Sequence, residues 1–131
     1  MPPRTDLLRQ VYDALGRRDF ETLAGLADPD FEMDLTDRVL NPATYRGADG
    51  LARFLEEVDE LWTSMDLAVE RVLERGDEAL AILRVRLEGR GSGVGLDDRI
   101  AQLWTLRDGK LVRMRLRQDA DAALAEFEAG G

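Results

Sequence analysis

Carboxylates, arginines and tyrosines carry nearly all the chemistry open to this chain, because its 131 residues include no histidine and no cysteine. Histidine is the commonest general base and the commonest zinc ligand in proteins, and cysteine supplies disulfides and thiolate metal sites. Any catalysis would therefore depend on carboxylates, tyrosine, lysine, arginine or bound water, without a metal or another cofactor. The acidic residues near the C-terminus lie on a predicted helix, which we interpret as a solvated face.

One arginine has the position expected of a ligand-binding residue. Leu80, Ile82 and Arg84 alternate along a predicted strand and therefore share one of its faces. On this pattern Arg84 would enter a cavity and pair with Asp34 or with the carboxylate of a ligand. The alternative interpretation is a surface ion pair, which contributes little to stability.

A second group of arginines lies on the last predicted strand. Arg113, Arg115 and Arg117 alternate with apolar residues and so share one face. A buried and unpaired row of cations would be costly, so we expect the row to face solvent or to be neutralised by carboxylates. A partner subunit or the strand that carries Glu70 and Glu74 would supply these carboxylates. We favour an outer face of the sheet that a dimer partner covers in part.

The elements that must position these residues are clearest near the C-terminal end. Asp108-Gly109 predicts a tight turn between strands over 96–107 and 110–118, because glycine tolerates the positive φ that such turns require. Alternation in the first of these strands places four side chains on one face: Ile100, Gln102, Trp104 and Leu106.

Apolar residues at three- and four-residue spacing predict three helices before this hairpin. The first runs from Thr5 or Asp6 to about Gly16, and the second runs from Asp19 to the Asp28-Pro29 pair. The third and longest begins near Asp49 and has an apolar face made of Leu51, Phe54, Leu55, Val58, Leu61 and Trp62.

Further strands are expected over 31–35, 66–75 and 78–90, and a short helix is expected after Asp119. Strict alternation in the first of these strands places Glu32 and Asp34 opposite Phe31, Met33 and Leu35. The glycine-rich run 89–95 lies between strands, so we interpret it as a flexible hairpin and not as a phosphate-binding loop. The order of elements predicts an α+β fold with a curved antiparallel sheet around helices.

Composition and charge exclude several classes of protein. The chain is 44% hydrophobic and 34% charged, which is typical of one globular domain, here residues 1–131. Its net charge of −9 argues against nucleic acid or an anionic membrane as a partner. We find no apolar core of a signal peptide and no run long enough to span a membrane, and we therefore expect a cytoplasmic protein.

The sequence resembles the nuclear transport factor 2-like superfamily, and within it the SnoaL-like proteins. The resemblance covers nearly the whole chain and rests on segments 18–23, 28–32, 45–51 and 104–112. It implies a conical, cystatin-like α+β roll in which a curved antiparallel sheet wraps around N-terminal helices. In such folds the pocket lies between the sheet and the helices, so site residues come from inward-facing positions.

The ketosteroid isomerase branch of this superfamily suggests a first set of site residues. Its general base is an Asp near the end of the first strand, and Asp34 matches that position. A carboxylate at the mouth of an apolar cone has its pKa raised by desolvation and can then shuttle a proton near neutral pH. The alternative is a solvated Asp paired with an arginine.

The oxyanion hole of that branch is not reproduced. It uses a Tyr on the first helix, and Tyr12 lies one position from the match. It also uses a protonated Asp on the next-to-last strand, where this chain has Ala101 or Gln102. Gln102 and the indole nitrogen of Trp104 would each supply one neutral hydrogen-bond donor, which is weaker than the original pair.

Two other branches suggest different chemistry. SnoaL-type polyketide cyclases use an Asp near the end of the last strand, and Asp119 is the nearest match. Its alternative role is the N-cap of the closing helix. In the limonene epoxide hydrolase branch the signature is Arg-x-Asp, but Arg84-Val85-Arg86 lacks the Asp and Leu116 stands at the second Asp position. Epoxide hydrolysis is therefore disfavoured.

Two hypotheses follow. The first is a cofactor-independent enzyme that performs isomerase- or cyclase-type proton transfer on an apolar, carbonyl-bearing small molecule. Tyr45, near the start of the long helix, Trp62 and Trp104 would contribute to binding, although both tryptophans also fit a core role. The second is a non-catalytic ligand carrier or dimeric interaction module. Under either hypothesis we expect a homodimer built on the outer face of the sheet, where Leu103 and Leu111 would be exposed.

Overall fold

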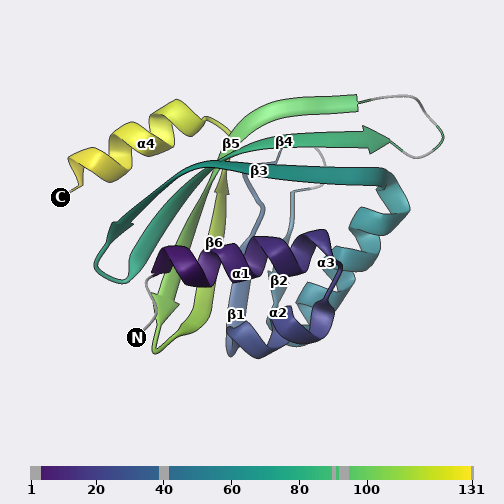
Figure 1. The fold of residues 1–131 in the computed structure, drawn as a ribbon, viewed down its shortest axis with the longest axis horizontal. Coiled ribbons are helices and arrows are strands. Elements are labelled where there is room, and N and C mark those ends of the chain that lie inside the picture. The colour runs from purple at the N-terminus through teal and green to yellow at the C-terminus, as the bar shows by residue number, and fades with distance from the viewer. Residues whose placement is uncertain (1–3, 39–41, 90, 92–94, 131) are drawn as a thin grey trace.

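The chain folds into four helices and one six-stranded sheet (Figure 1). The computed structural model describes residues 4–38, 42–89, 91 and 95–130. In chain order the elements are α1 (Arg4–Gly16), α2 (Phe20–Leu26), β1 (Ala27–Asp34), β2 (Thr44–Arg46), α3 (Gly47–Leu61), β3 (Trp62–Arg75), β4 (Glu78–Gly89), β5 (Gly95–Arg107), β6 (Lys110–Arg117) and α4 (Ala120–Ala129). The predicted α+β class is confirmed.

The helices form where the apolar spacing predicts them. Asp19 caps α2, because its side chain accepts a hydrogen bond from the backbone N–H of Thr22. Thr5 and Asp6 lie inside α1, which begins one residue earlier than expected. The apolar face predicted for α3 is wrong at its end, because Leu61 is 51% exposed and Trp62 is already the first residue of β3.

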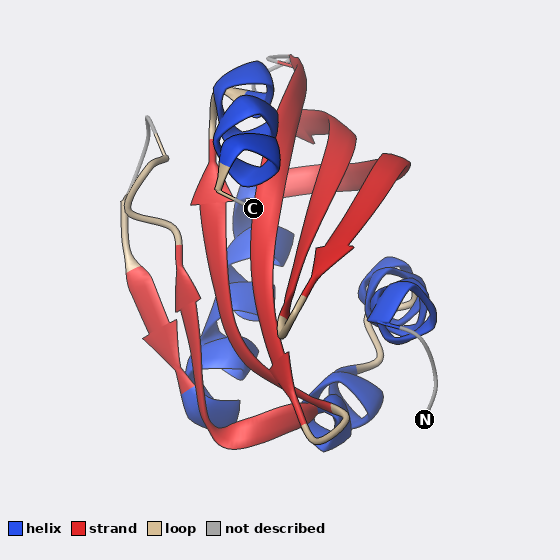
Figure 2. Cartoon of the chain, turned by 90° about the vertical axis from the view of Figure 1, so that its left-hand side faces the viewer, coloured by secondary structure: helices blue, strands red, loops and turns tan. Residues whose placement is uncertain are grey.

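The sheet has the order β2-β1-β6-β5-β4-β3. All its pairs are antiparallel except β1 with β6, which run parallel, so the sheet is mixed where a purely antiparallel one was expected. The sequence analysis missed β2, a three-residue strand in a region interpreted as a loop. Bulges interrupt the register in β1, β3 and β6, and such bulges bend a sheet locally. Figure 2 shows the resulting strong bend.

The hairpin between β5 and β6 turns at the predicted pair. Asp108 and Gly109 have φ values of 54° and 74°, which are the positive values that a tight two-residue turn requires. Most of the glycine-rich connection between β4 and β5, predicted as a flexible hairpin, lies outside the described residues, as does Asn41 of the loop before β2.

The two faces of the sheet bury different sets of side chains. The inner face packs against α1, α2 and α3 and forms the larger core. The outer face carries α4, which lies on the opposite side of the sheet from α1 (Figure 1). Under α4 a smaller apolar cluster is buried, made of Leu80, Ile82, Ala101, Ala120, Ala123 and Phe127.

Both leucines expected on an exposed outer face are covered within the same chain. Leu103 packs against the cluster under α4. Leu111 is 3% exposed and belongs to the inner core, because the register between Thr105 and Leu106 shifts by one residue and turns Leu111 inward.

Gly50 brings the first turn of α3 close to β2. A Cβ at this position would lie 2.9 Å from the carbonyl carbon of Tyr45, a distance that real side chains do not adopt. The absence of a side chain therefore allows the close packing that fixes Tyr45 beside the helix.

Candidate functional site

An apolar cavity lies inside the cone between the bent sheet and the helices. Its volume is about 140 Å³. All six strands except β2 contribute to its wall, together with α1, α3 and the segment after β1. The lining residues are mostly aliphatic, aromatic or methionine side chains: Leu15, Met33, Leu35, Arg38, Phe54, Val58, Trp62, Met65, Leu67, Val85, Leu87, Ile100, Gln102, Trp104, Met114 and Leu116.

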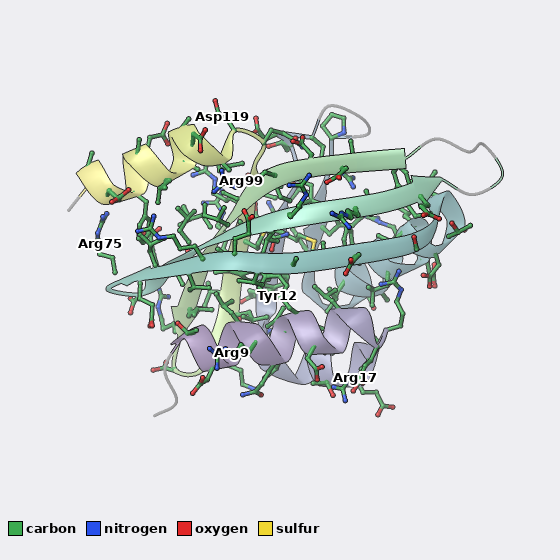
Figure 3. All side chains as sticks on the ribbon, turned by 45° about the horizontal axis from the view of Figure 1, so that its top comes forward. Arg9, Tyr12, Arg17, Arg75, Arg99 and Asp119 are labelled. Carbon is green, nitrogen blue, oxygen red and sulfur yellow. The ribbon has the colours of Figure 1, made fainter. Side chains whose placement is uncertain are left out.

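Three polar side chains at the wall of this cavity, those of Trp104, Tyr12 and Gln102, form a chain of hydrogen bonds. The indole Nε1–H of Trp104 donates to the hydroxyl oxygen of Tyr12 at 3.0 Å. The Tyr12 hydroxyl in turn donates to Oε1 of Gln102 at 2.6 Å. Trp104 and Gln102 come from β5, whereas Tyr12 lies on α1 and points toward the sheet (Figure 3). Three of the predicted binding residues are therefore brought together.

Packing holds this polar chain in place. The rings of Tyr12 and Trp104 meet edge to face, with centroids 6.2 Å apart and an interplanar angle of 86°. Phe31 stacks against Trp104, with ring centroids 6.4 Å apart. Burial raises the pKa of the Tyr12 hydroxyl, and the hydrogen bond from Trp104 opposes that effect only in part. Tyr12 is therefore neutral at physiological pH.

A more polar cleft of about 440 Å³ adjoins the cavity and shares with it Arg38, Phe54, Val58 and Trp62. The cleft is also lined by Tyr45, Glu57 and Glu60. Because the cleft and the cavity share these residues, we refer to the cleft as the mouth of the cone.

Tyr45 connects the charged groups of the mouth. Its hydroxyl donates to a carboxylate oxygen of Glu57 and accepts a hydrogen bond from Arg38 at 3.4 Å. Burial raises the pKa of Tyr45, and the hydrogen bond to Glu57 acts in the same direction. Arg53 lies over the Tyr45 ring, 5.0 Å from its centroid. Tyr45 therefore lies in the mouth, outside the inner cavity.

Sequence reasoning missed Arg38 and Glu57. Glu57 lies three residues after Phe54 on α3, so helical spacing already places it on the face that borders the pocket. Arg38 lies in the irregular segment after β1, where no periodic pattern indicates its direction.

The position expected for Asp34 is wrong. Its side chain is 17% exposed and lies beside Arg113 and Arg115, at 3.5 and 3.9 Å, on the side of β1 opposite the cavity-lining Met33. The pKa of Asp34 is lowered, where a raised value was predicted. Hydrogen bonds from the Thr36 hydroxyl and backbone N–H are the main cause, followed by the charges of Arg115 and Arg113, and together they outweigh desolvation.

Asp119 is the N-cap of α4, which was the alternative role considered for it. Its side chain caps α4 by accepting a hydrogen bond from the backbone N–H of Ala122 at 3.0 Å. The residue is exposed and lies at the start of α4, on the outer face of the sheet (Figure 3). It is therefore remote from the inner face that lines the cavity.

Arg84 also lies on the outer face, so its predicted entry into the cavity is wrong. Leu80, Ile82 and Arg84 do share a face, but this face is the one that α4 covers in part. Arg84 is exposed and makes a bidentate ion pair with Asp97, at 2.8 and 3.2 Å. Its Nε–H bond to Asp97 raises the pKa of the guanidinium.

Each arginine of the β6 row has a carboxylate partner within the chain. Arg113 and Arg115 face Asp34 of β1, and Arg117 makes an ion pair with Glu126 of α4 at 2.6 Å. Of the partners expected on β3, Glu70 pairs with Arg99 instead. The row therefore faces outward, as expected, with different acidic partners.

The polar side chains on the cavity wall are those of Arg38, Trp62, Gln102 and Trp104. No Asp or Glu lines this cavity in the part of the chain that the structure describes. Within the same part, no group of three or more Asp and Glu side chains is arranged to hold a metal ion. None of the described helices is long and apolar enough to cross a membrane.

The sequence model of the SnoaL-like domain family matches residues 8–114, from α1 into β6. No curated protein matches the chain. Solved structures match over nearly the whole length. TerC, co-crystallized with polyporic acid, is 25% identical, with a TM-score of 0.79 over 95% of this chain and 97% of TerC.

Two further structures support the fold. A protein from Jannaschia sp. CCS1, described as a SnoaL-like polyketide cyclase, is 20% identical with a TM-score of 0.75, over 93% of this chain and 88% of that one. A protein of unknown function with a cystatin-like fold, from Xanthomonas campestris, is 21% identical with a TM-score of 0.76, over 94% and 95% of the two chains.

Proposed function

Because this chain belongs to the SnoaL-like domain family, we propose that it binds a compact, mainly apolar small molecule with a carbonyl or enol oxygen inside its cone. The observation that carries the proposal is the Gln102 carboxamide in a mostly apolar wall, with its oxygen hydrogen-bonded to the Tyr12 hydroxyl. Apolar walls supply affinity through burial, and a few placed polar groups orient the ligand.

The neighbour TerC supports a small organic ligand in this fold. It was crystallised with polyporic acid and is 25% identical to this chain. The cavity of about 140 Å³ would take a ligand of one or two fused rings, and the wider cleft leaves room for substituents near Arg38.

Proton transfer of the isomerase or cyclase type is a second candidate, favoured by the carboxylate at the mouth. Glu57 lines the cleft that adjoins the cavity, and it would accept a proton from a carbon next to the ligand carbonyl. Gln102 would then stabilise the enolate oxygen by donating a hydrogen bond. Asp34 and Asp119 are not proposed as bases, because both side chains lie away from the cavity.

Binding can be tested with 1-indanone as the probe, followed by NMR of methionine methyl groups. Met33, Met65 and Met114 line the cavity, so their methyl signals should shift together in a saturable manner. Leu67→Phe, which narrows the cavity, should weaken the effect. Leu73→Phe is a matched control, because Leu73 is a half-buried residue of the same strand that packs under α4. Unchanged methyl signals at millimolar probe would reject the proposal.

A further inference from the structure

A separate cleft lies on the outer face of the sheet, between α4 and the strands beneath it. Its volume is about 260 Å³. Its lining combines four charged side chains with apolar ones and a terminal glycine of the helix: Arg75, Glu78, Leu80, Leu103, Arg117, Ala123, Glu126, Phe127 and Gly130. The sheet separates this outer cleft from the cone, because the cone is lined by the inner face.

The floor of the outer cleft is apolar. Leu80, Ala123 and Phe127 are buried members of the cluster under α4, and the half-buried Leu103 packs against that cluster. An apolar group that covered Leu103 would extend the cluster and be stabilised by its removal from water. A mainly apolar surface with a few placed polar groups is typical of small-molecule sites.

The four charged side chains of the outer cleft differ in whether they have a partner. Arg117 and Glu126 form a bidentate ion pair, with N–O distances of 2.6 and 3.1 Å. Within residues 4–38, 42–89, 91 and 95–130, neither Arg75 nor Glu78 has an ion pair or a side-chain hydrogen bond. One positive and one negative group therefore remain open in the outer cleft.

These two open groups lie side by side on the sheet. Arg75 and Glu78 are direct partners in the register of β3 and β4, and directly opposed residues of antiparallel strands share a face. The Arg75 guanidinium nevertheless lies over the ring of Phe127, 4.4 Å from its centroid, at the C-terminal part of α4 (Figure 3). This contact holds the cation at the cleft but supplies no oxygen acceptor for its N–H donors.

We infer that the outer cleft binds a zwitterionic α-amino acid with an apolar side chain, with Arg75 pairing with the carboxylate and Glu78 with the ammonium group. A guanidinium matches a carboxylate in geometry as well as in charge. A plain carboxylic acid would be attracted by Arg75 and repelled by Glu78, and a plain amine would meet the reverse. A ligand with both charges on one carbon gains from both side chains, while its apolar side chain covers Leu103.

The inference goes beyond the proposed function and does not depend on it, because the two sites lie on opposite faces of the sheet. The test uses three compounds that share one branched carbon skeleton. L-Leucine carries both charges, 4-methylpentanoate lacks the ammonium group, and 3-methylbutylamine lacks the carboxylate. NMR of backbone amides in β5 and α4 measures their affinities. L-Leucine should bind about fivefold more tightly than either of the other two.

Substitutions assign each charge to its side chain. Arg75→Met keeps an unbranched chain over Phe127 but removes the cation, so it should weaken L-leucine about fivefold and leave 3-methylbutylamine no weaker. Glu78→Gln should weaken L-leucine similarly and leave 4-methylpentanoate no weaker. Arg71→Met and Glu88→Gln are the matched controls, because both residues are exposed on the same two strands and lie outside the outer cleft. Neither control should change the affinity for L-leucine.

The comparison of the three compounds on the wild-type protein requires no substitution, so it decides the matter even if a variant fails to fold. Equal affinities for all three would overturn the inference, and so would the absence of any shift at tens of millimolar L-leucine. Shifts of the methionine methyl signals of the cone, in place of the amides of β5 and α4, would also overturn it. These outcomes leave the binding of 1-indanone in the cone untouched, so the two proposals fail separately.

Discussion

Tyr12 of α1 and Trp104 of β5 are 92 residues apart in the chain, and the indole nitrogen of Trp104 lies 3.0 Å from the Tyr12 hydroxyl oxygen. This contact fastens the first helix to the inner face of the sheet at the wall of the cavity. The same hydroxyl donates to Gln102. Tyr12 therefore both holds α1 against the sheet and contacts a polar side chain of the cavity wall.

Tyr12→Phe should lower the free energy of unfolding by about 1–2 kcal/mol, because it leaves the Trp104 N–H and the Gln102 carbonyl without their partner. Urea denaturation monitored by circular dichroism measures the change. In a Gln102→Leu background the same substitution should cost less, since one of the two orphaned groups is then absent. Equal costs in both backgrounds would argue against coupling between Tyr12 and Gln102.

The two tyrosines of the chain should both ionise above the ordinary phenol range, because burial raises the pKa of Tyr12 and of Tyr45. A raised pKa means that the folded state holds the proton more tightly than the unfolded state. The stabilisation is complete below the unfolded pKa of about 10 and is lost as pH rises through the folded pKa. Absorbance at 295 nm during a pH titration measures phenolate formation. Phenolate that appears at pH 10 in the folded protein would contradict this expectation.

Asp34 should make the opposite contribution, because hydrogen bonds from Thr36 and the charges of Arg115 and Arg113 lower its pKa. The folded state then releases the proton more readily, so the stabilisation is present above the unfolded pKa of about 3.9 and is lost as pH falls through the folded pKa. Asp34→Asn should therefore reduce stability at neutral pH, by about 1 kcal/mol, and flatten its acid dependence.

Asp30→Asn is the control for this substitution, since Asp30 is an exposed residue of the same strand. Carboxylate NMR titration of the wild-type protein reports the Asp34 pKa directly. Neither variant should change binding of 1-indanone in the cone. Loss of 1-indanone binding in Asp34→Asn, but not in Asp30→Asn, would show that Asp34 belongs to the binding site.

Periodicity identified which side chains share a face, but it did not always identify which face is inside. On β5 the alternation correctly grouped Gln102 with Trp104, and both reach the cavity. On β4 the apolar run continues through Ala79, Leu80, Ala81 and Ile82, so both faces look like core. Arg84 was assigned inward because α4, which covers Leu80 and Ile82 from outside, was not foreseen as a second layer.

The site itself depends on contacts that local pattern does not encode. Nothing in the spacing of α1 indicates that Tyr12 meets residues of a strand 90 residues later. The resemblance to ketosteroid isomerases did point to Tyr12 and Gln102, but it also led to a raised pKa for Asp34. The sequence placed Asp34 opposite Phe31 and Met33, and this alternation was the better guide to its surroundings.

The homodimer stays a prediction, and the leucines that motivated it no longer support it, since Leu103 and Leu111 are covered within the chain. What the outer face still offers is a set of charged side chains that includes Arg84, Asp97 and Arg99. Association through such a face should weaken with salt. Sedimentation velocity at tens of micromolar protein, at low and high salt, measures the oligomeric state. A monomer under both conditions would refute the homodimer.

Substitutions of Asp119 can distinguish a structural role from a catalytic one. An N-cap needs only a side-chain oxygen that accepts a hydrogen bond, whereas a general base must also take up a proton. Asn keeps a side-chain oxygen that can accept from the backbone N–H of Ala122, but it cannot take up a proton. Asp119→Ala should therefore cost about 1 kcal/mol of stability, whereas Asp119→Asn should be close to neutral. Urea denaturation of the two variants measures the difference.

The same pair of variants decides the cyclase-type role of Asp119. If the residue only caps α4, then Asp119→Asn retains both the stability and any proton-transfer activity detected on a carbonyl probe, such as deuterium exchange next to the carbonyl of 1-indanone. If Asp119 were the base, Asp119→Asn would stay folded and lose that exchange. We expect the first result, because α4 holds Asp119 on the outer face of the sheet, while the donors that would polarise the carbonyl lie on the inner face.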